Sequence, residues 1–536
     1  MMVDGGVSLR SVFDGFDLVR TGLVRAAKLD FGGPRITGVR LPLQSLMRGN
    51  AAKAIEYYRG VFSWTGVSPE CMPGDIFLLR APSKEWAAKL HRFDWLHDLS
   101  ASGQALHRTL ARRMVLGWAE TAPTRQSMIP GILDRRIINL LFHASYLISN
   151  ASDDFRAALF RALSRDVAKL RRSNPRNRND QFNRAIALFA ASISLRGCEP
   201  LREQASAALR ESLANTILPD GGHVSRNPAA LLNAALDLVP LVRALQSAHE
   251  PVLANAAQTV ERIYPMLRML RHGDGGLAHF QGAGYLRSAE LEQLLSCDTS
   301  LGKPLNQASY SGYCRTSQGQ SALILDAGSG PACDSPLAFE FSIGAFRIFT
   351  SCATPEEAPE AWRQAASRLA AHNTAELPSL RRLERQVSAE VIPSPRGVLI
   401  RGSNGAASGP RHNRDLFLAS NGEDLRGEES FSETANREIL IRFHLHPSIR
   451  ASQARNGNEA WLLLPNRSAW RFFVKGGEVS FEESVYLADP SGPRKTSQLV
   501  IRAEAPGATP VKWALRRIDK QPRHNAADNE RPELPF

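Results

Sequence analysis

The chain has 536 residues, of which 43% are apolar and 22% charged, values typical of a folded protein with room for two or three domains. Lys and Arg outnumber Asp and Glu by 66 to 53, which gives a formal net charge of +13. This excess favours polyanionic partners, but the basic residues are spread along the chain, so a nucleic-acid-binding protein is not indicated. Six cysteines form no Cys-x-x-Cys pair, which excludes a zinc ribbon, and a chain of this size needs no disulfide framework.

Residues 1–85 have a mixed composition and are interpreted as an N-terminal lead-in that packs on the helical segment after it. The first twenty residues contain acids and no apolar core, so a standard secretory signal is not predicted. The longest apolar run, residues 137–148, is too short to span a membrane, and we expect no integral membrane segment.

The segment from about residue 86 to 305 has the periodicity of helices. Apolar residues recur at i, i+3 and i+4 within residues 155–167, 205–217 and 252–267. Ser152 precedes one of these patterns as a helix start signal. Successive helices joined by short polar turns predict a helical toroid or solenoid.

A polar elbow, residues 218–228 (Leu-Pro-Asp-Gly-Gly-His-Val-Ser-Arg-Asn-Pro), interrupts the helical segment. Asp220-Gly221-Gly222 is typical of a turn, and Asn227-Pro228 of a helix N-cap followed by the first helical residue. Such a loop can direct its side chains at a ligand, although an ordinary interhelical loop has the same composition.

A second glycine-rich loop, Arg271-His-Gly-Asp-Gly-Gly276, comes after a predicted helix and could line the rim of a cleft or simply end the helix. It lacks the strand and helix context of a phosphate-binding loop, which excludes nucleotide binding. His444 and His446 alternate along a predicted strand, a spacing compatible with metal binding, but packing is the favoured interpretation because no third ligand is visible.

From about residue 306 to 518 the pattern changes to short strands separated by turn residues, which predicts an antiparallel β-sandwich. One helical interruption spans residues 356–372, and the tail at 519–536 is polar and predicted to be disordered. The predicted fold class is therefore multidomain α+β, with an N-terminal (α/α) toroid followed by a C-terminal antiparallel β-sandwich.

Several segments, in this order along the chain, resemble the heparinase II/III family of polysaccharide lyases, in particular an uncharacterised proteobacterial branch. They are residues 91–99, the elbow at 218–228, Ser311-Gly312-Tyr313, Phe339-Glu-Phe-Ser-Ile-Gly344, Ala371-His-Asn-Thr374, residues 441–447 and residues 482–486. The resemblance covers roughly residues 85–518 and implies the same toroid and sandwich.

The resemblance also implies cleavage of uronate-containing chains by β-elimination. That reaction needs a donor that neutralises the uronate carboxylate, a Tyr or His base, and an acid for the leaving oxygen. His223 and His372 are the predicted catalytic residues. Arg226, Asn227 and Tyr313 are the predicted substrate-binding residues, since a bidentate Arg suits a carboxylate.

The chain departs from the family pattern at several positions. Where characterised members carry a Tyr after the Pro of the elbow, this chain has Ala229-Ala230, and Tyr310 or Tyr313 could replace it. The family's His-x-His-x-Asp run is Pro331-Ala-Cys-Asp-Ser335 here, and Ser351 stands where zinc-binding members have an Asp. Only His372 matches that ligand set, so we predict no family-type zinc and no cofactor.

The resemblance supports two main functional hypotheses. The first is a carbon–oxygen lyase that cleaves an acidic polysaccharide bound in a cleft between toroid and sandwich. The second is a non-catalytic protein that binds an acidic glycan on the same fold, with a helical scaffold for a protein partner as a weaker third. The resemblance implies the cell envelope or periplasm, with the cytoplasm as the alternative.

Overall fold

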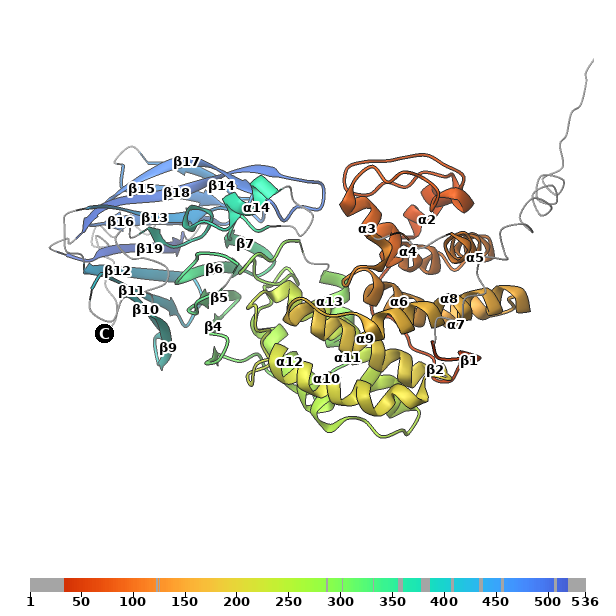
Figure 1. Cartoon of the computed structure of the whole chain (residues 1–536). Coiled ribbons are helices and arrows are strands. Elements are labelled where there is room, and N and C mark those ends of the chain that lie inside the picture. The colour runs from red at the N-terminus through yellow and green to blue at the C-terminus, as the bar shows by residue number, and fades with distance from the viewer. Residues whose placement is uncertain are drawn as a thin grey trace, which may run out of the picture. The chain divides into compact units, whose positions relative to one another are not determined.

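The computed structural model describes residues 33–518, apart from 122–123, 125, 286–287, 301, 331, 355–359, 377–385, 406–408, 433–436, 455–456 and 506–508. The predicted disordered tail at 519–536 lies outside the described residues. The chain forms two compact units, residues 1–209 and 210–536. Figure 1 shows helices in the N-terminal part and strands in the C-terminal part.

The first unit is helical. Its helices are α2 (Ala51–Tyr58), α3 (Lys84–Arg92), α4 (Trp95–Ala101), α5 (Ala105–Glu120), α6 (Leu133–Phe142), α7 (Ala144–Ile148), α8 (Asp153–Arg172), α9 (Arg178–Ser194) and the start of α10 (Arg202–Thr216). A short antiparallel ladder pairs β1 (Gly38–Val39) with β2 (Leu195–Arg196).

Local sequence explains where α8 begins. The Ser152 hydroxyl accepts a hydrogen bond from the Phe155 amide at 3.3 Å, as the predicted start signal requires. Asp153 and Asp154 occupy the first turn and basic residues the last, which suits the helix dipole. The predicted helix start at Ser152 is therefore confirmed.

The second unit begins with helices and continues as sheets. Its helices are α11 (Pro228–Ser247), α12 (Ala254–Met269), α13 (Ser288–Leu295) and α14 (Glu360–Ala366). Among the described residues, α11 is the helix long and apolar enough to cross a membrane, but 72% of its most apolar window is buried inside the protein. It is therefore a core helix.

The strands form three antiparallel sheets. The five-stranded sheet contains β3 (Gln307–Ala308), β4 (Tyr313–Gln318), β5 (Ser321–Asp326), β6 (Ala338–Ile343) and β7 (Phe346–Phe349). The four-stranded sheet has the order β17 (Glu478–Tyr486), β18 (Arg494–Ala505), β13 (Arg437–His444) and β8 (Ala375–Glu376). The eight-stranded sheet has the order β14 (Arg450–Gln453), β15 (Glu459–Leu463), β16 (Ala469–Lys475), β19 (Val511–Arg517), β12 (Asp424–Ser432), β11 (Arg411–Ala419), β10 (Gly397–Gly405) and β9 (Gln386–Ser394).

One continuous apolar core holds these sheets together. At its centre Phe443 of β13 contacts the rings of Phe349, Phe472 and Trp513, which come from β7, β16 and β19. Gly427 of β12 is required here, because a Cβ at this position would lie 2.0 Å from the Trp513 ring. Aromatic side chains from all three sheets thus pack into one sandwich.

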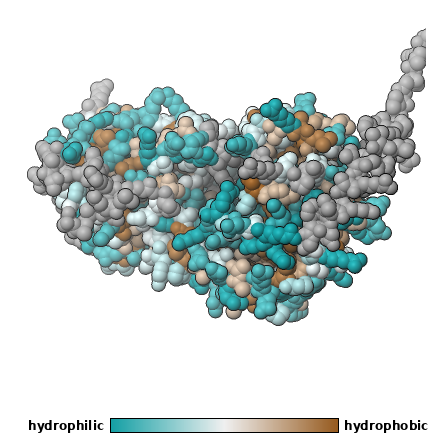
Figure 2. Space-filling view, in the orientation of Figure 1, coloured by the Kyte–Doolittle hydropathy of each residue, from teal (hydrophilic) through white to brown (hydrophobic). Residues whose placement is uncertain are grey.

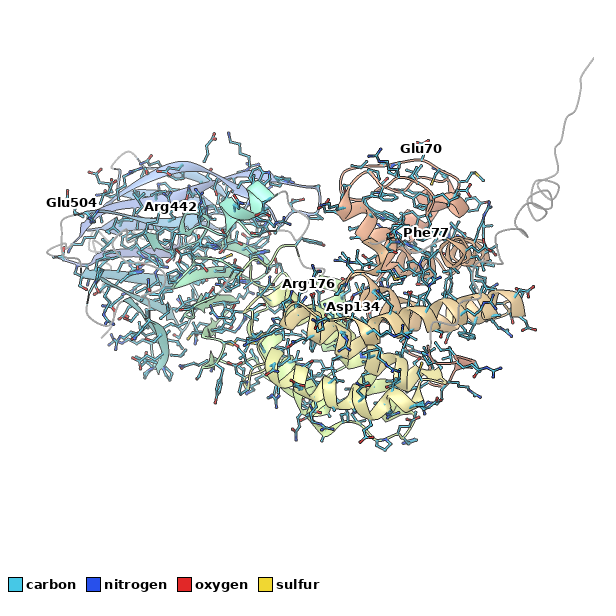
Figure 3. All side chains as sticks on the ribbon, in the orientation of Figure 1. Glu70, Phe77, Asp134, Arg176, Arg442 and Glu504 are labelled. Carbon is cyan, nitrogen blue, oxygen red and sulfur yellow. The ribbon has the colours of Figure 1, made fainter. Side chains whose placement is uncertain are left out.

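Polar side chains cover the outside of the folded chain. Hydrophilic residues occupy much of the face in Figure 2, with hydrophobic residues between them. Arg442, labelled in Figure 3, lies on β13 and forms ion pairs with Glu482 of β17 at 3.2 Å and Glu376 of β8 at 3.5 Å. The pair with Glu376 joins adjacent strands, and the pair with Glu482 spans β18, which lies between β13 and β17.

Candidate functional site

The elbow at residues 218–228 is a tightly hydrogen-bonded turn. The Leu218 amide donates to the Gly222 carbonyl at 2.7 Å, and the Gly221 amide donates to the Leu218 carbonyl at 2.9 Å. Gly221 has a φ of +86°, and a Cβ there would lie 2.0 Å from the carbonyl oxygen of Arg262. A positive φ and this close approach explain the glycine.

Asp220 joins the elbow to the entry of β4. Its Oδ2 accepts hydrogen bonds from the amides of Tyr310 and Ser311 at 2.9 and 2.6 Å, and its Oδ1 accepts from the Ser311 hydroxyl at 2.8 Å. The Asp220 carboxylate is therefore hydrogen-bonded to the backbone and hydroxyl of Ser311 and to the Tyr310 amide, and this is a structural role.

Arg226 is buried where the elbow contacts Ser311, Tyr313 of β4 and Asp326 of β5, a contact region that we call the joint. Its guanidinium is 6% exposed, forms an ion pair with the fully buried Asp326 of β5 and donates to the Ser311 carbonyl at 2.5 Å. It also lies 4.8 Å from the centre of the Tyr313 ring, whose hydroxyl donates to the Arg226 carbonyl. Burial disfavours the charge, but the neighbouring Asp326 carboxylate raises the pKa of Arg226.

His223 and Asn227 also have local structural partners. Asn227 caps α11, because its Oδ1 accepts from the Ala229 and Ala230 amides at 2.7 and 3.2 Å. The His223 ring is 6% exposed and accepts from the Ser225 amide at 3.1 Å. Burial lowers the pKa of His223 to about 4, so the imidazole is neutral at pH 7.

The structure thus brings Arg226, Asn227 and Tyr313 together in one joint, with His223 in the same loop. His372 makes none of these contacts. It comes directly after the short 3-10 helix Leu369–Ala371, is 2% exposed, and has a pKa that burial lowers to about 4. Its catalytic assignment and those of the elbow residues stay predictions.

Residues expected at the family zinc site do not fit a zinc ion. Of those positions only His372 keeps the family's residue, since the run at 331–335 has Cys333 and no histidine, and Ser351 is a buried serine. Within the part of the chain that the structure describes, no group of three or more His, Cys, Asp or Glu side chains is arranged to hold a metal.

His444 and His446 separate instead of sharing one face. His444 is buried, with Nδ1 2.7 Å from the Ser484 hydroxyl and 3.6 Å from the Cys352 sulfur. His446 lies beyond the end of β13 and its ring packs on Tyr486 with centres 4.9 Å apart. The strand ends at His444, so the expected alternation does not reach His446.

The loop at residues 271–276 rests on strand β7. A Cβ at Gly273 would lie 1.9 Å from the Gly344 carbonyl oxygen, so glycine permits this close approach. Arg347 of β7 binds Asp274 with two hydrogen bonds, at 2.7 Å through Nε and 3.2 Å through Nη2. Although burial opposes it, this guanidinium lowers the pKa of Asp274 to about 2, so the carboxylate is ionised.

Glu340 of β6 lies beneath the loop and is fully buried. It accepts hydrogen bonds from the His279 and Ser351 amides at 3.1 and 3.0 Å, and from Arg347 at 3.3 Å. Nε2 of His272 lies 3.0 Å from Oε2 of Glu340, the oxygen that also accepts from Arg347. Burial alone would raise the pKa of Glu340, but the nearby histidines and Arg347 hold it well below its usual range.

A cavity of about 240 Å³ opens above this network. Side chains with polar groups and rings converge on it from the loop and the segment after it, from β7, and from the C-terminal ends of β13 and β17: Asp274, His279, Tyr285, Arg347, His446 and Tyr486. The Tyr486 hydroxyl lies 3.3 Å from Nε2 of His279. A concave site with convergent polar groups is the usual form of a small-ligand site.

Burial sets the ionisation of the groups in this cavity. It lowers the pKa of His279 to about 3 and that of His446 to about 4, and it raises the pKa of Tyr486 to about 12. At pH 7 the two rings are therefore neutral imidazoles, and Tyr486 is a neutral hydrogen-bond donor.

The sequence pointed to only part of this site. The loop at 271–276 was a candidate rim, and Asp274 and Gly276 do line the cavity. His279, Tyr285, Arg347 and Tyr486 were not singled out. Arg347 and Tyr486 lie 73 and 212 positions from Asp274, and no local pattern connects such distant residues.

Comparison with known proteins defines the class. Residues 300–514 match the family model described as heparinase II/III-like, C-terminal. A crystal structure of heparinase III superposes with a TM-score of 0.70 at 14% identity, covering 97% of this chain and 94% of that one. A heparan sulfate lyase from Pedobacter heparinus gives 0.60 at 14% identity, covering 88% and 83%. The predicted fold class, a helical toroid followed by a β-sandwich, is confirmed.

A curated relative extends the similarity beyond the sandwich. FtsZ-localized protein C of Caulobacter vibrioides (strain NA1000 / CB15N) is 30% identical over 492 residues, which cover 83% of this chain and 84% of the relative. The chain belongs to the heparinase II/III-like family.

Proposed function

We propose that this chain is a non-catalytic member of its family, which binds a sugar chain and does not cleave it. One observation carries the proposal: the elbow residues predicted to bind the substrate and neutralise its carboxylate hold the fold together. Arg226 neutralises Asp326, and Asn227 caps α11. A lyase needs a donor free to neutralise the uronate carboxylate in the transition state, and neither side chain is free to do so.

The similarity to FtsZ-localized protein C supports a place of action. Because the two chains are alike over most of their lengths, we propose that this chain also works where FtsZ assembles. All six cysteines are free thiols, four of them buried, as suits a reducing compartment. We therefore propose the cytoplasm in preference to the periplasm that the lyase resemblance implied.

Lyase activity is the second candidate, and the cavity above Glu340 favours it. Neutral His279 could accept a proton, and the Tyr486 hydroxyl beside it could donate one to a leaving oxygen. The structural relatives named as lyases share this fold. One observation argues against this candidate. Arg347 already forms ion pairs with Asp274 and Glu340, so it has little capacity left to neutralise a uronate carboxylate.

A cleavage assay separates the two candidates. The protein is incubated with heparin, heparan sulfate, chondroitin sulfate and alginate, and ultraviolet absorbance reports the unsaturated uronate product. We expect no product, with heparinase III as the positive control, together with retention of the protein by immobilised glycans. Product that disappears in His279→Gln would establish the lyase instead. Failure to bind any sugar would overturn the proposed function.

The place of action is tested in dividing cells. A fluorescent fusion should gather at midcell and disperse when FtsZ is depleted. Accessible-thiol labelling of intact cells should leave the six cysteines unmodified, with a periplasmic cysteine protein as the control. A fusion spread evenly along the envelope would contradict this part of the proposal.

A further inference from the structure

The cavity lined by Asp274, His279, Tyr285 and Tyr486 has an unusual balance of exposed charge. Its cation, Arg347, is 3% exposed and binds Asp274, Glu340 and the Leu277 carbonyl. The Asp274 side chain, by contrast, is 33% exposed, and Asp489 at the rim is 24% exposed. A ligand entering the cavity therefore meets carboxylate oxygens and not a guanidinium.

A second observation points to a ligand. His279 is 5% exposed, and its Nδ1 is buried with no hydrogen-bond partner among the described residues. A buried polar atom without a partner costs about 1–3 kcal/mol. When the ring proton is on Nε2, which then donates to the Tyr486 hydroxyl, Nδ1 is an acceptor that a hydroxyl or ammonium group of a ligand would satisfy.

Rings at the cavity suit the apolar face of a sugar. Tyr486 packs edge-on against both His279 and His446, with ring centres 5.7 and 4.9 Å apart, so its orientation is fixed. Tyr285 is 49% exposed and leaves ring surface free for a ligand. Tyrosine combines an apolar ring with a polar hydroxyl, as binding to the C–H and O–H groups of a sugar requires.

We propose that this cavity binds one sugar residue that carries no acidic group and donates hydrogen bonds through its hydroxyl or ammonium groups. This inference rests on the proposed function. A uronate or sulfated residue is disfavoured: although Asp274 and Asp489 pair with Arg347 and Arg494, their exposed oxygens face the ligand while Arg347 is 3% exposed. At about 240 Å³ the cavity is small for a ligand site and suits a single ring, not a longer chain.

Calorimetry with three matched monosaccharides tests this proposal on the full chain. Glucosamine and glucose should bind, and glucuronate should bind at least about tenfold more weakly than glucose. Asp489→Asn should weaken glucosamine more than glucose, because it removes a negative charge. Preference for glucuronate, or no binding of any of the three, would overturn the proposal.

Variants locate the binding. Tyr285→Ala should weaken glucose binding about tenfold, and Tyr486→Phe should also weaken it. Tyr58→Ala is the matched control, because Tyr58 of α2 is 50% exposed, lies outside this cavity and should leave binding unchanged. Equal effects of Tyr285→Ala and Tyr58→Ala would overturn the site. If immobilised glycans still retain the protein while the cavity variants have no effect, this inference fails and the proposed function stands.

Discussion

The elbow at 218–228 and the loop at 271–276 contain the same chemistry in opposite arrangements. In the elbow, the helical side supplies Arg226 and strand β5 supplies Asp326. In the loop, the helical side supplies Asp274 and strand β7 supplies Arg347. The Asp326 carboxylate is fully covered, whereas Asp274 is 33% exposed. When the strand supplies the carboxylate, as in the elbow, the carboxylate is buried. When the loop supplies it, as at Asp274, its oxygens are exposed to a cavity.

Two histidines, His223 and His446, show the same difference between the elbow and the cavity. His223 in the elbow and His446 at the cavity each accept a hydrogen bond from the amide of a serine two residues later. Each has a pKa that burial lowers to about 4. His223 lies in the closed joint, while His446 lines the cavity, so the same local turn serves packing in one place and a site in the other.

The largest expected effect is the loss of Arg226. Arg226→Ala leaves Asp326 as an uncompensated buried charge and should lower the free energy of unfolding by about 3–5 kcal/mol. Denaturant unfolding followed by fluorescence measures it. The control is Arg502→Ala, which breaks ion pairs at a guanidinium that is 45% exposed and should leave the free energy of unfolding nearly unchanged. Equal losses in the two variants would contradict a structural role for the elbow.

Acidification should affect the elbow through His223. Its folded pKa of about 4 lies below the unfolded value of about 6.5, so the unfolded state binds more protons between these values. Stability is therefore lost as pH falls from about 6.5 to about 4, by about 3 kcal/mol from this group. His223→Asn keeps an acceptor for the Ser225 amide and should flatten this part of the pH profile. An unchanged profile would show that His223 is solvated.

Tyr313 should contribute a smaller amount. Tyr313→Phe removes the hydroxyl that donates to the Arg226 carbonyl and keeps the ring beneath the guanidinium. We expect a loss of about 1 kcal/mol in denaturant unfolding. Tyr310→Phe, at an exposed side chain three residues away, is the matched control with no expected effect. A glycan-binding defect in Tyr313→Phe without loss of stability would instead restore Tyr313 as a substrate-binding residue.

The smallest effect is expected at Asp274, because its side chain is partly exposed. Its folded pKa of about 2 lies below the ordinary value of 3.8, so it contributes stability above about pH 4 that is lost as pH falls toward 2. Asp274→Asn should therefore reduce stability at pH 7 and make acid unfolding less steep between these values. Acid titration followed by circular dichroism measures it, and a steeper transition would contradict the assigned ion pair.

Periodicity predicted the regular elements well because it reflects local rules. The short strands expected between residues 306 and 518 include those at 321–326 and 397–401, which lie within β5 and β10, and the helical pattern at 155–167 lies within α8. Turn composition was less reliable. Asn404-Gly405 is typical of a turn, yet both residues belong to β10 and pair with β11, because the strand partner satisfies their backbone groups. The four-part division at residues 85, 305 and 518 stays a prediction beside the two compact units.

The sequence by itself determined the fold class, the cap of α11 at Asn227 and the turn at Gly221, since each depends on residues close together along the chain. Only the tertiary structure decided the use of the polar side chains. Asp326 lies 100 positions from Arg226, and Arg347 lies 73 positions from Asp274. A buried charge takes whichever opposite charge the packing brings to it, and packing is a property of the whole sandwich and its helices.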